Sequence, residues 1–139
     1  MNWKKFFIAF IAAFVFLFLF GFLWYGKLMQ DVHNEVPVLW RPEADFGTHF
    51  QWLIFGHVVM AFFLTMLCAR FLPAGGAGSG ARLGILVALV YIGKHFITYA
   101  VQPLTTTILC GWIVGDLIMF VIAGAIIGAI YKSSATATV

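Results

Sequence analysis

Charged side chains are scarce in this chain of 139 residues: Asp, Glu, Lys and Arg make up 9% of it, against roughly 25% in a soluble domain. Hydrophobic residues make up 63%, and the mean hydropathy is +1.03. This balance excludes a soluble globular domain and predicts an integral membrane protein. The net charge of +3 comes from basic residues at the ends of apolar runs, where they meet lipid headgroups, so nucleic-acid binding is not expected.

Residue types that carry common chemistry are also sparse. No serine precedes Ser79, and no nucleophile elbow is present, so an enzyme is not expected. The two cysteines, Cys68 and Cys110, fall at opposite depths of the predicted bundle, which argues against a disulfide and against a soft-metal site. The glycine-rich stretch 73–80 lacks the Lys-Ser/Thr of a phosphate loop and is interpreted as a linker. No cofactor or metal is predicted.

Four long apolar runs make up most of the chain. A helix needs about 20 residues to cross the hydrocarbon of a bilayer, and a lone strand cannot satisfy its backbone in lipid. The chain is therefore predicted to be an all-α four-helix bundle and a single transmembrane domain over 1–139, with a disordered tail at 133–139. The first run is too long for a signal peptide and is predicted to be an uncleaved span that offers only packing and lipid contact. The helices are expected at about 6–25, 50–71, 83–101 and 110–131, with an outer loop at 27–48. Pro42 and the carboxylates of Glu43 and Asp45 indicate that the second helix begins outside the membrane, before it crosses from about residue 50.

The basic residues predict the orientation of this bundle. Cytoplasmic segments of membrane proteins carry an excess of Lys and Arg. Five basic residues fall at one end of the predicted bundle and two at the other, so both termini are expected in the cytoplasm. The five are Lys4, Lys5, Arg70, Arg82 and Lys132, and the two are Lys27 and Arg41.

Polar residues inside the apolar runs form the candidate site. A cation at the centre of a membrane helix costs at least about 2.5 to 3.5 kcal/mol, so Lys94 should have a partner, and Asp116 is the one acid inside a predicted span. At about 1.5 Å per residue, Lys94, His95, His57 and Asp116 reach a similar depth. The predicted polar cluster has Lys94 paired with Asp116 and consists of His57, Lys94, His95, Thr98, Tyr99, Gln102 and Asp116.

The fourth run carries glycines four residues apart. Such pairs let a neighbouring helix approach closely. Gly111 with Gly115, and Gly124 with Gly128, are therefore predicted to be helix-packing positions. Packing within the chain is favoured over packing in a homodimer.

Three functions agree with these features. An accessory, assembly or structural subunit that packs against a larger membrane protein is slightly favoured by the small size and the lack of helix breakers deep in the spans. The alternative is a small solute, cation or proton transporter that uses Lys94, His95 and Asp116. A second alternative is a haem protein with His57 and His95 as axial ligands. Besides the lipid bilayer, the possible partners are the larger membrane protein or a second copy of the chain.

Four segments together resemble a group of small uncharacterised bacterial inner-membrane proteins. They are residues 1–5 (Met-Asn-Trp-Lys-Lys), 39–44 (Leu-Trp-Arg-Pro-Glu-Ala), 99–103 (Tyr-Ala-Val-Gln-Pro) and 122–132, which begins Ile-Ala-Gly-Ala. In overall plan the chain is similar to the domain-of-unknown-function family 1761. The resemblance implies four helices in a bacterial plasma membrane, and it implies no activity.

Overall fold

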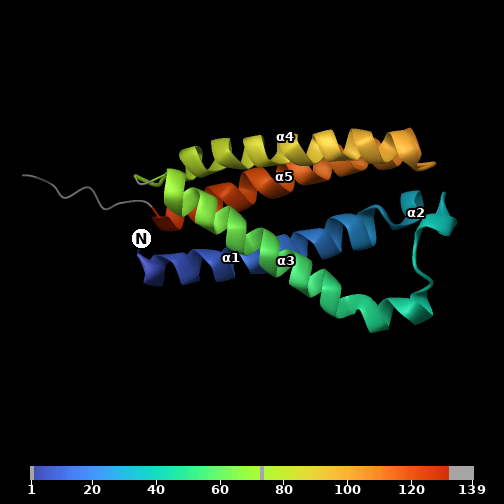
Figure 1. Cartoon of the computed structure of the whole chain (residues 1–139), viewed down its shortest axis with the longest axis horizontal. Coiled ribbons are helices and arrows are strands. Elements are labelled where there is room, and N and C mark those ends of the chain that lie inside the picture. The colour runs from blue at the N-terminus through green and yellow to red at the C-terminus, as the bar shows by residue number, and fades with distance from the viewer. Residues whose placement is uncertain (1, 73, 132–139) are drawn as a thin grey trace, which may run out of the picture.

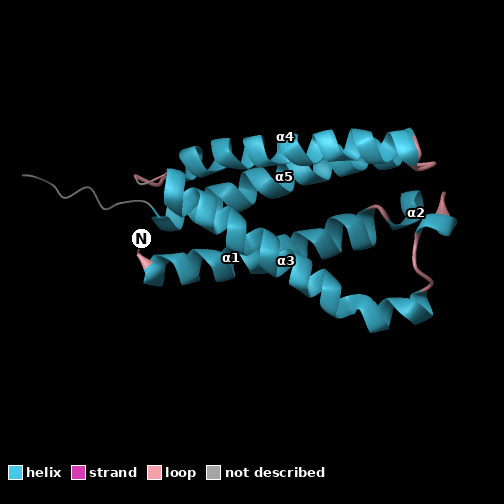
Figure 2. Cartoon of the chain, viewed as in Figure 1, coloured by secondary structure: helices cyan, strands magenta, loops and turns pink. Residues whose placement is uncertain are grey.

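The computed structural model of the chain describes residues 2–72 and 74–131, and no strand occurs in this part (Figure 2). The predicted all-α class is confirmed. The predicted tail at 133–139, and Lys132 beside it, lie outside the described residues. The elements are α1 (Trp3–Leu23), the π-helix η1 (Trp24–Leu28), α2 (Gln30–His33), the 3-10 helix η2 (Pro37–Leu39), α3 (Glu43–Phe71), α4 (Ala77–Val101) and α5 (Thr106–Tyr131).

Four stretches are long and apolar enough to cross a membrane: Trp3–Leu28, Glu43–Phe71, Ala77–Val101 and Thr106–Tyr131. Each extends beyond the predicted apolar run. The third begins at Ala77 although glycine is abundant there, because packing against α5 outweighs the low helix propensity of these glycines.

The segment expected as an outer loop, 27–48, is mostly short helical turns rather than open loop. The π-helix prolongs α1 to Leu28, and α2 and η2 follow in quick succession. Proline precedes the first helical residue of α3, and acidic side chains occupy its first turn, so the helix begins at Glu43, before the apolar run that starts near residue 50. These turns cap one end of the bundle, called the α2 end below (right in Figure 1).

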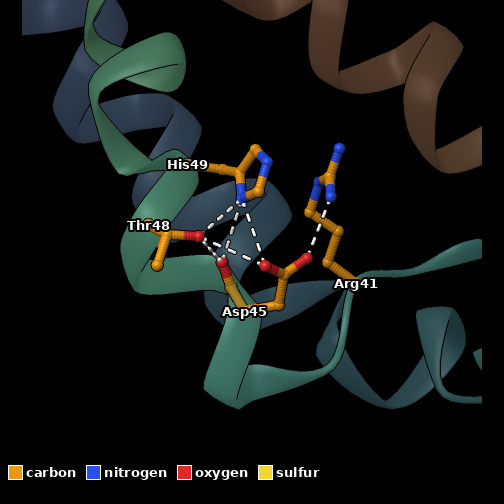
Figure 3. A network of polar contacts seen from close by, with 4 residues as sticks. All are labelled: Arg41, Asp45, Thr48 and His49. Carbon is orange, nitrogen blue, oxygen red and sulfur yellow. Dashed lines mark hydrogen bonds and ion pairs between the residues drawn. The ribbon is translucent and has the colours of Figure 1, made fainter.

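The start of α3 is fixed by an exposed polar network around Asp45 (Figure 3). Arg41 Nη1 contacts Asp45 Oδ2 at 2.9 Å, Thr48 Oγ1 donates to the Asp45 carbonyl at 2.8 Å, and His49 Nδ1 lies 3.4 Å from Asp45 Oδ1. The carboxylate is thus used to stabilise the first turn. Among the described residues, no group of three or more His, Cys, Asp or Glu could hold a metal ion.

The closest packing joins α4 and α5, which run side by side along their length (Figure 1). A Cβ atom built on Gly80 or Gly84 of α4 would overlap the backbone of α5, and one built on Gly124 or Gly128 would overlap the backbone of α4. The structure therefore places the predicted face of Gly124 and Gly128 against a helix of the same chain. The turn before α4 adds a backbone hydrogen bond of 2.7 Å from Gly76 to the Gly128 carbonyl.

The apolar core lies where α1 crosses α3 and contacts α5. Ala9 and Ala13 of α1 and Ala61 of α3 are fully buried, so the helices approach closely at the crossing. Leu17 and Phe120 fill the space beside them. Towards its first residues α3 leaves α1 (Figure 1), and it shares almost no contacts with α4. A side chain on the first half of α3 therefore has fewer neighbours from the other helices.

Candidate functional site

A buried carboxylate on α5 connects three elements of the fold. Asp116 is 4% exposed, and each of its oxygens has its own partner. His95 Nε2 of α4 lies 2.6 Å from Oδ2, and the Tyr25 hydroxyl of η1 donates to Oδ1 at 2.5 Å. Charged hydrogen bonds of this length are strong in a low-dielectric environment. We call Tyr25, His95 and Asp116 the carboxylate triad.

Glycines on α5 make room for this triad. A Cβ atom at Gly115 would overlap the Trp24 ring and lie 2.8 Å from the Tyr25 hydroxyl, and one at Gly111 would overlap Met29. The Trp24 indole donates to the Gly111 carbonyl at 3.0 Å. Gly111 and Gly115 therefore admit the side chains of the turns after α1 rather than a helix backbone. They differ in this respect from Gly124 and Gly128.

The sequence prediction missed Tyr25, because the first span was expected to offer only packing and lipid contact. In the structure Trp24 and Tyr25 begin a π-helix, whose wider turn shifts the direction of the side chains that follow. Tyr25 consequently faces α5. The available signal was chemical: tyrosine is apolar with a single polar end, and when buried it needs a partner for its hydroxyl.

The predicted ion pair between Lys94 and Asp116 is not formed. Among the described residues Asp116 has one ion-pair partner, His95, and Lys94 is exposed. Adjacent residues on an α-helix point about 100° apart, and in this bundle His95 rather than Lys94 is the one directed at the carboxylate. Each oxygen of Asp116 instead contacts another side chain, Tyr25 or His95.

The other predicted cluster residues are dispersed. Thr98 donates its hydroxyl to the Lys94 carbonyl at 3.0 Å, within its own helix. Tyr99 is exposed and its hydroxyl lies 3.3 Å from Thr106 Oγ1, while Gln102 caps the end of α4 and is exposed. A cavity lies beside the triad, and neither Tyr99 nor Gln102 lines it.

His57 also differs from its predicted role. Its Nδ1 lies 2.8 Å from the Leu53 carbonyl of its own helix. Its ring packs edge-to-face with the Phe18 ring, and the two ring centroids are 5.5 Å apart. A Cβ atom at Gly21 would lie 2.9 Å from His57 Nε2, so this nitrogen faces α1. With His95 Nε2 held by Asp116, the two imidazoles are not arranged as a pair of haem ligands.

A cavity of about 400 Å³ lies beside the triad and extends between α3, α4 and α5. Ligand sites in proteins commonly have volumes of about 300 to 1,000 Å³ with apolar walls and a few polar groups. Met60, Tyr91 and Met119 lie one helical turn further from the α2 end than the polar residues. The cavity is lined by Tyr25, His33, Trp40, His57, Met60, Tyr91, Lys94, His95, Thr98, Trp112, Asp116 and Met119.

Aromatic side chains cover the cavity at the α2 end. The rings of His33 and Trp40 lie 4.4 Å apart between centroids, and the Trp40 indole donates to the His33 carbonyl at 2.8 Å. Trp112 donates its indole N–H to His33 Nε2 at 3.2 Å, and its ring lies 5.1 Å from that of His95. Trp112 thus connects the covering residues to the triad.

Burial lowers the pKa of His33 below its usual value, an effect partly opposed by a hydrogen bond to the Tyr25 backbone. His33 is therefore neutral at pH 7. Its Nε2 lone pair then accepts the hydrogen bond from Trp112. The cover over the cavity depends on the uncharged form of this imidazole.

Comparisons with known proteins do not assign the chain to a family or to a function. No family model matches the sequence, and the searches of curated proteins and of solved structures find no match either. The resemblance to family 1761 stays a prediction. The candidate function must be argued from the carboxylate triad and the cavity beside it.

Proposed function

We propose that the chain is a multi-pass protein of a bacterial plasma membrane, with both termini in the cytoplasm and the α2 end outside. The four apolar helices support insertion. The distribution of basic residues supports the orientation, since Arg70 and Arg82 flank the turn between α3 and α4 while the α2 end carries most of the acids.

Cysteine labelling tests the orientation. In a variant with Cys68 and Cys110 replaced by Ala, Asn34→Cys should react with a membrane-impermeant maleimide added to intact cells, because Asn34 is exposed at the α2 end. Gly78→Cys, which is exposed at the opposite end of the bundle, should react only after lysis. The reverse pattern would contradict the proposed orientation.

We propose further that the cavity binds a small solute and that the carboxylate triad exchanges protons with it. One observation carries this proposal: titratable side chains from five elements, η1, α2, α3, α4 and α5, converge on a single cavity inside the apolar bundle. Ionisable residues within a membrane span are candidates for proton or solute sites by default. The titratable or charged groups that face the cavity are Tyr25, His33, His57, Tyr91, Lys94, His95 and Asp116.

In this proposal the charges of the triad and of Lys94 couple binding of the solute to uptake of a proton. Lys94 and the His95–Asp116 pair line the same cavity. Protonation of the His95–Asp116 pair adds one positive charge to the cavity wall. A bound anion would stabilise that charge, so uptake of the anion and of a proton would be coupled by linkage.

Proton flux into liposomes tests this function. Under an imposed pH gradient the wild-type protein should carry protons, and Asp116→Asn should reduce the rate by about tenfold or more, because positioned acid–base groups contribute roughly 10²–10⁴ in rate. Tyr99→Phe is the matched control: it removes a hydroxyl from α4 outside the cavity and should leave the rate unchanged. An Asp116→Asn variant that carries protons at the wild-type rate would contradict the proposal.

An accessory subunit is the second candidate, and the packing of α4 favours it. This helix packs extensively against α5 alone, and its Val90 and Ile97 are 73% and 69% exposed. A helix of a larger membrane protein could cover that face. Val90→Trp with Ile97→Trp should then release the protein from a complex of fixed stoichiometry, measured by native mass spectrometry of detergent extracts. An unchanged complex would count against this candidate.

A further inference from the structure

We propose that the solute of this cavity is an amphipathic acid, an alkyl chain with an anionic carboxylate or phosphate head, and that Lys94 binds the head. The inference rests on the proposed solute-binding function and names the ligand class. It follows from three features of α4: the state of Lys94, the residues that share its face, and the open side of the cavity.

Lys94 is a cation in the cavity wall without an acidic partner among the described residues. Asp116 is engaged by His95 and Tyr25, and the other four acids of the chain lie within 31–45, at the α2 end. Lys94 itself lies seven residues before the end of α4, about 10 Å along the helix axis. A charge at that depth in an apolar span favours a direct counter-ion, and no carboxylate among the described residues forms an ion pair with Lys94.

Beside Lys94, on the side away from Tyr91 and Thr98, the surface of α4 is apolar and exposed. Residues at i−4 and i−8 lie on the same side of a helix as residue i. For Lys94 these are Val90 and Leu86, which are 73% and 60% exposed. They extend from Lys94 towards the middle of the helix. An amphiphile whose head contacts Lys94 would therefore meet apolar surface on α4 next to its head, at Val90 and Leu86.

The cavity is open between α3 and α4. Its walls come from α3 and α4, yet these two helices share almost no contacts with each other. Apart from Lys94 and the triad, much of the lining is apolar or aromatic, including Met60 and Met119. A small hydrophilic anion would leave these surfaces without contacts, whereas an alkyl chain would cover them.

Tryptophan quenching measures the proposed binding, because Trp40 and Trp112 line the cavity. The purified protein is placed in phosphatidylcholine nanodiscs and titrated with brominated stearate, with brominated phosphatidylglycerol, or with brominated stearyl alcohol. Saturable quenching by stearate or by phosphatidylglycerol supports the proposal and identifies whether the head comes from a free acid or from a membrane lipid. Quenching by the uncharged alcohol at the same affinity, or by neither acid, overturns it.

Variants assign the head group to Lys94. Lys94→Met should weaken binding of the acid about tenfold or more, the usual cost of losing a hydrogen bond to a charged group, and Lys94→Arg should retain it. Lys27→Met removes a cation of the α2 end that lies over Phe22 outside the cavity, and it should bind as the wild type does. Equal affinity of Lys94→Met and wild type, or displacement of stearate by inorganic phosphate alone, overturns the inference.

The two proposals fail separately. Binding that depends on Lys94 without proton flux would remove the proton coupling and keep the ligand class. Flux that depends on Asp116 together with binding that ignores Lys94 would keep the coupling and remove the ligand class.

Discussion

His95→Phe is expected to lower the free energy of unfolding by about 3 to 5 kcal/mol, the range found when one partner of a buried ion pair is removed. This cost arises from the immediate surroundings of Asp116. Asp116 is almost fully buried and accepts from His95 at 2.6 Å, so the substitution leaves a buried carboxylate with Tyr25 as its one remaining side-chain partner. Thermal or denaturant unfolding in detergent measures the loss.

A double-mutant cycle identifies the partner of Asp116. Asp116→Leu combined with His95→Phe should cost far less than the sum of the two single changes, because no buried charge is left unpaired. Asp116→Leu combined with Lys94→Met should be additive, since no ion pair joins these residues. The opposite pattern, coupling to Lys94 and additivity with His95, would restore the pairing that the sequence suggested.

Gly124→Val is expected to destabilise the protein by about 3 kcal/mol or more, at or above the upper end of typical overpacking costs. The new side chain would meet the backbone of α4 at Gly80, and a backbone cannot rotate away as a side chain can. Because the α4–α5 contact is the most extensive in the fold, separating the two helices should disturb the whole bundle. Unfolding in detergent again provides the measurement.

Gly93→Ala is the matched control for the glycine contact. Gly93 lies on α4 like Gly80 and Gly84, but a Cβ atom there would meet nothing within 4 Å. Alanine favours helix over glycine by about 1 kcal/mol, so this change should be neutral or stabilising. If Gly93→Ala and Gly124→Val had equal effects, the cost would reflect helix propensity and not the close approach of the two helices.

The triad and Lys94 differ in whether their polar groups have partners among the described residues. The triad is a closed network in which every carboxylate oxygen has a partner, and this property suits a structural link between η1, α4 and α5. Lys94 has no such partner, so its ammonium group is available to bind the anionic head of the proposed ligand. The same short stretch of α4 therefore carries one residue for stability and, one position earlier, one for the proposed ligand.

The sequence by itself determined the helical architecture. Four apolar runs of sufficient length predict four helices, because an uninterrupted apolar segment in lipid can satisfy its backbone only as a helix. The proline and the acids at 42–45 also indicated where α3 begins. The glycine positions of α5 were visible, and Asp116 was recognised as the one acid inside a predicted span. These features depend on local composition and on the order of residues along one helix.

The tertiary structure decided which residues meet. Whether Lys94 or His95 faces Asp116 depends on the rotation of α4 against α5, and the contact between Gly80 and Gly124 fixes that rotation. Tyr25 reaches Asp116 only because a π-helix follows α1, a local change in winding that periodicity does not reveal. Partner choice in a bundle depends on helix rotation and crossing, which are set by packing over the whole length of each helix.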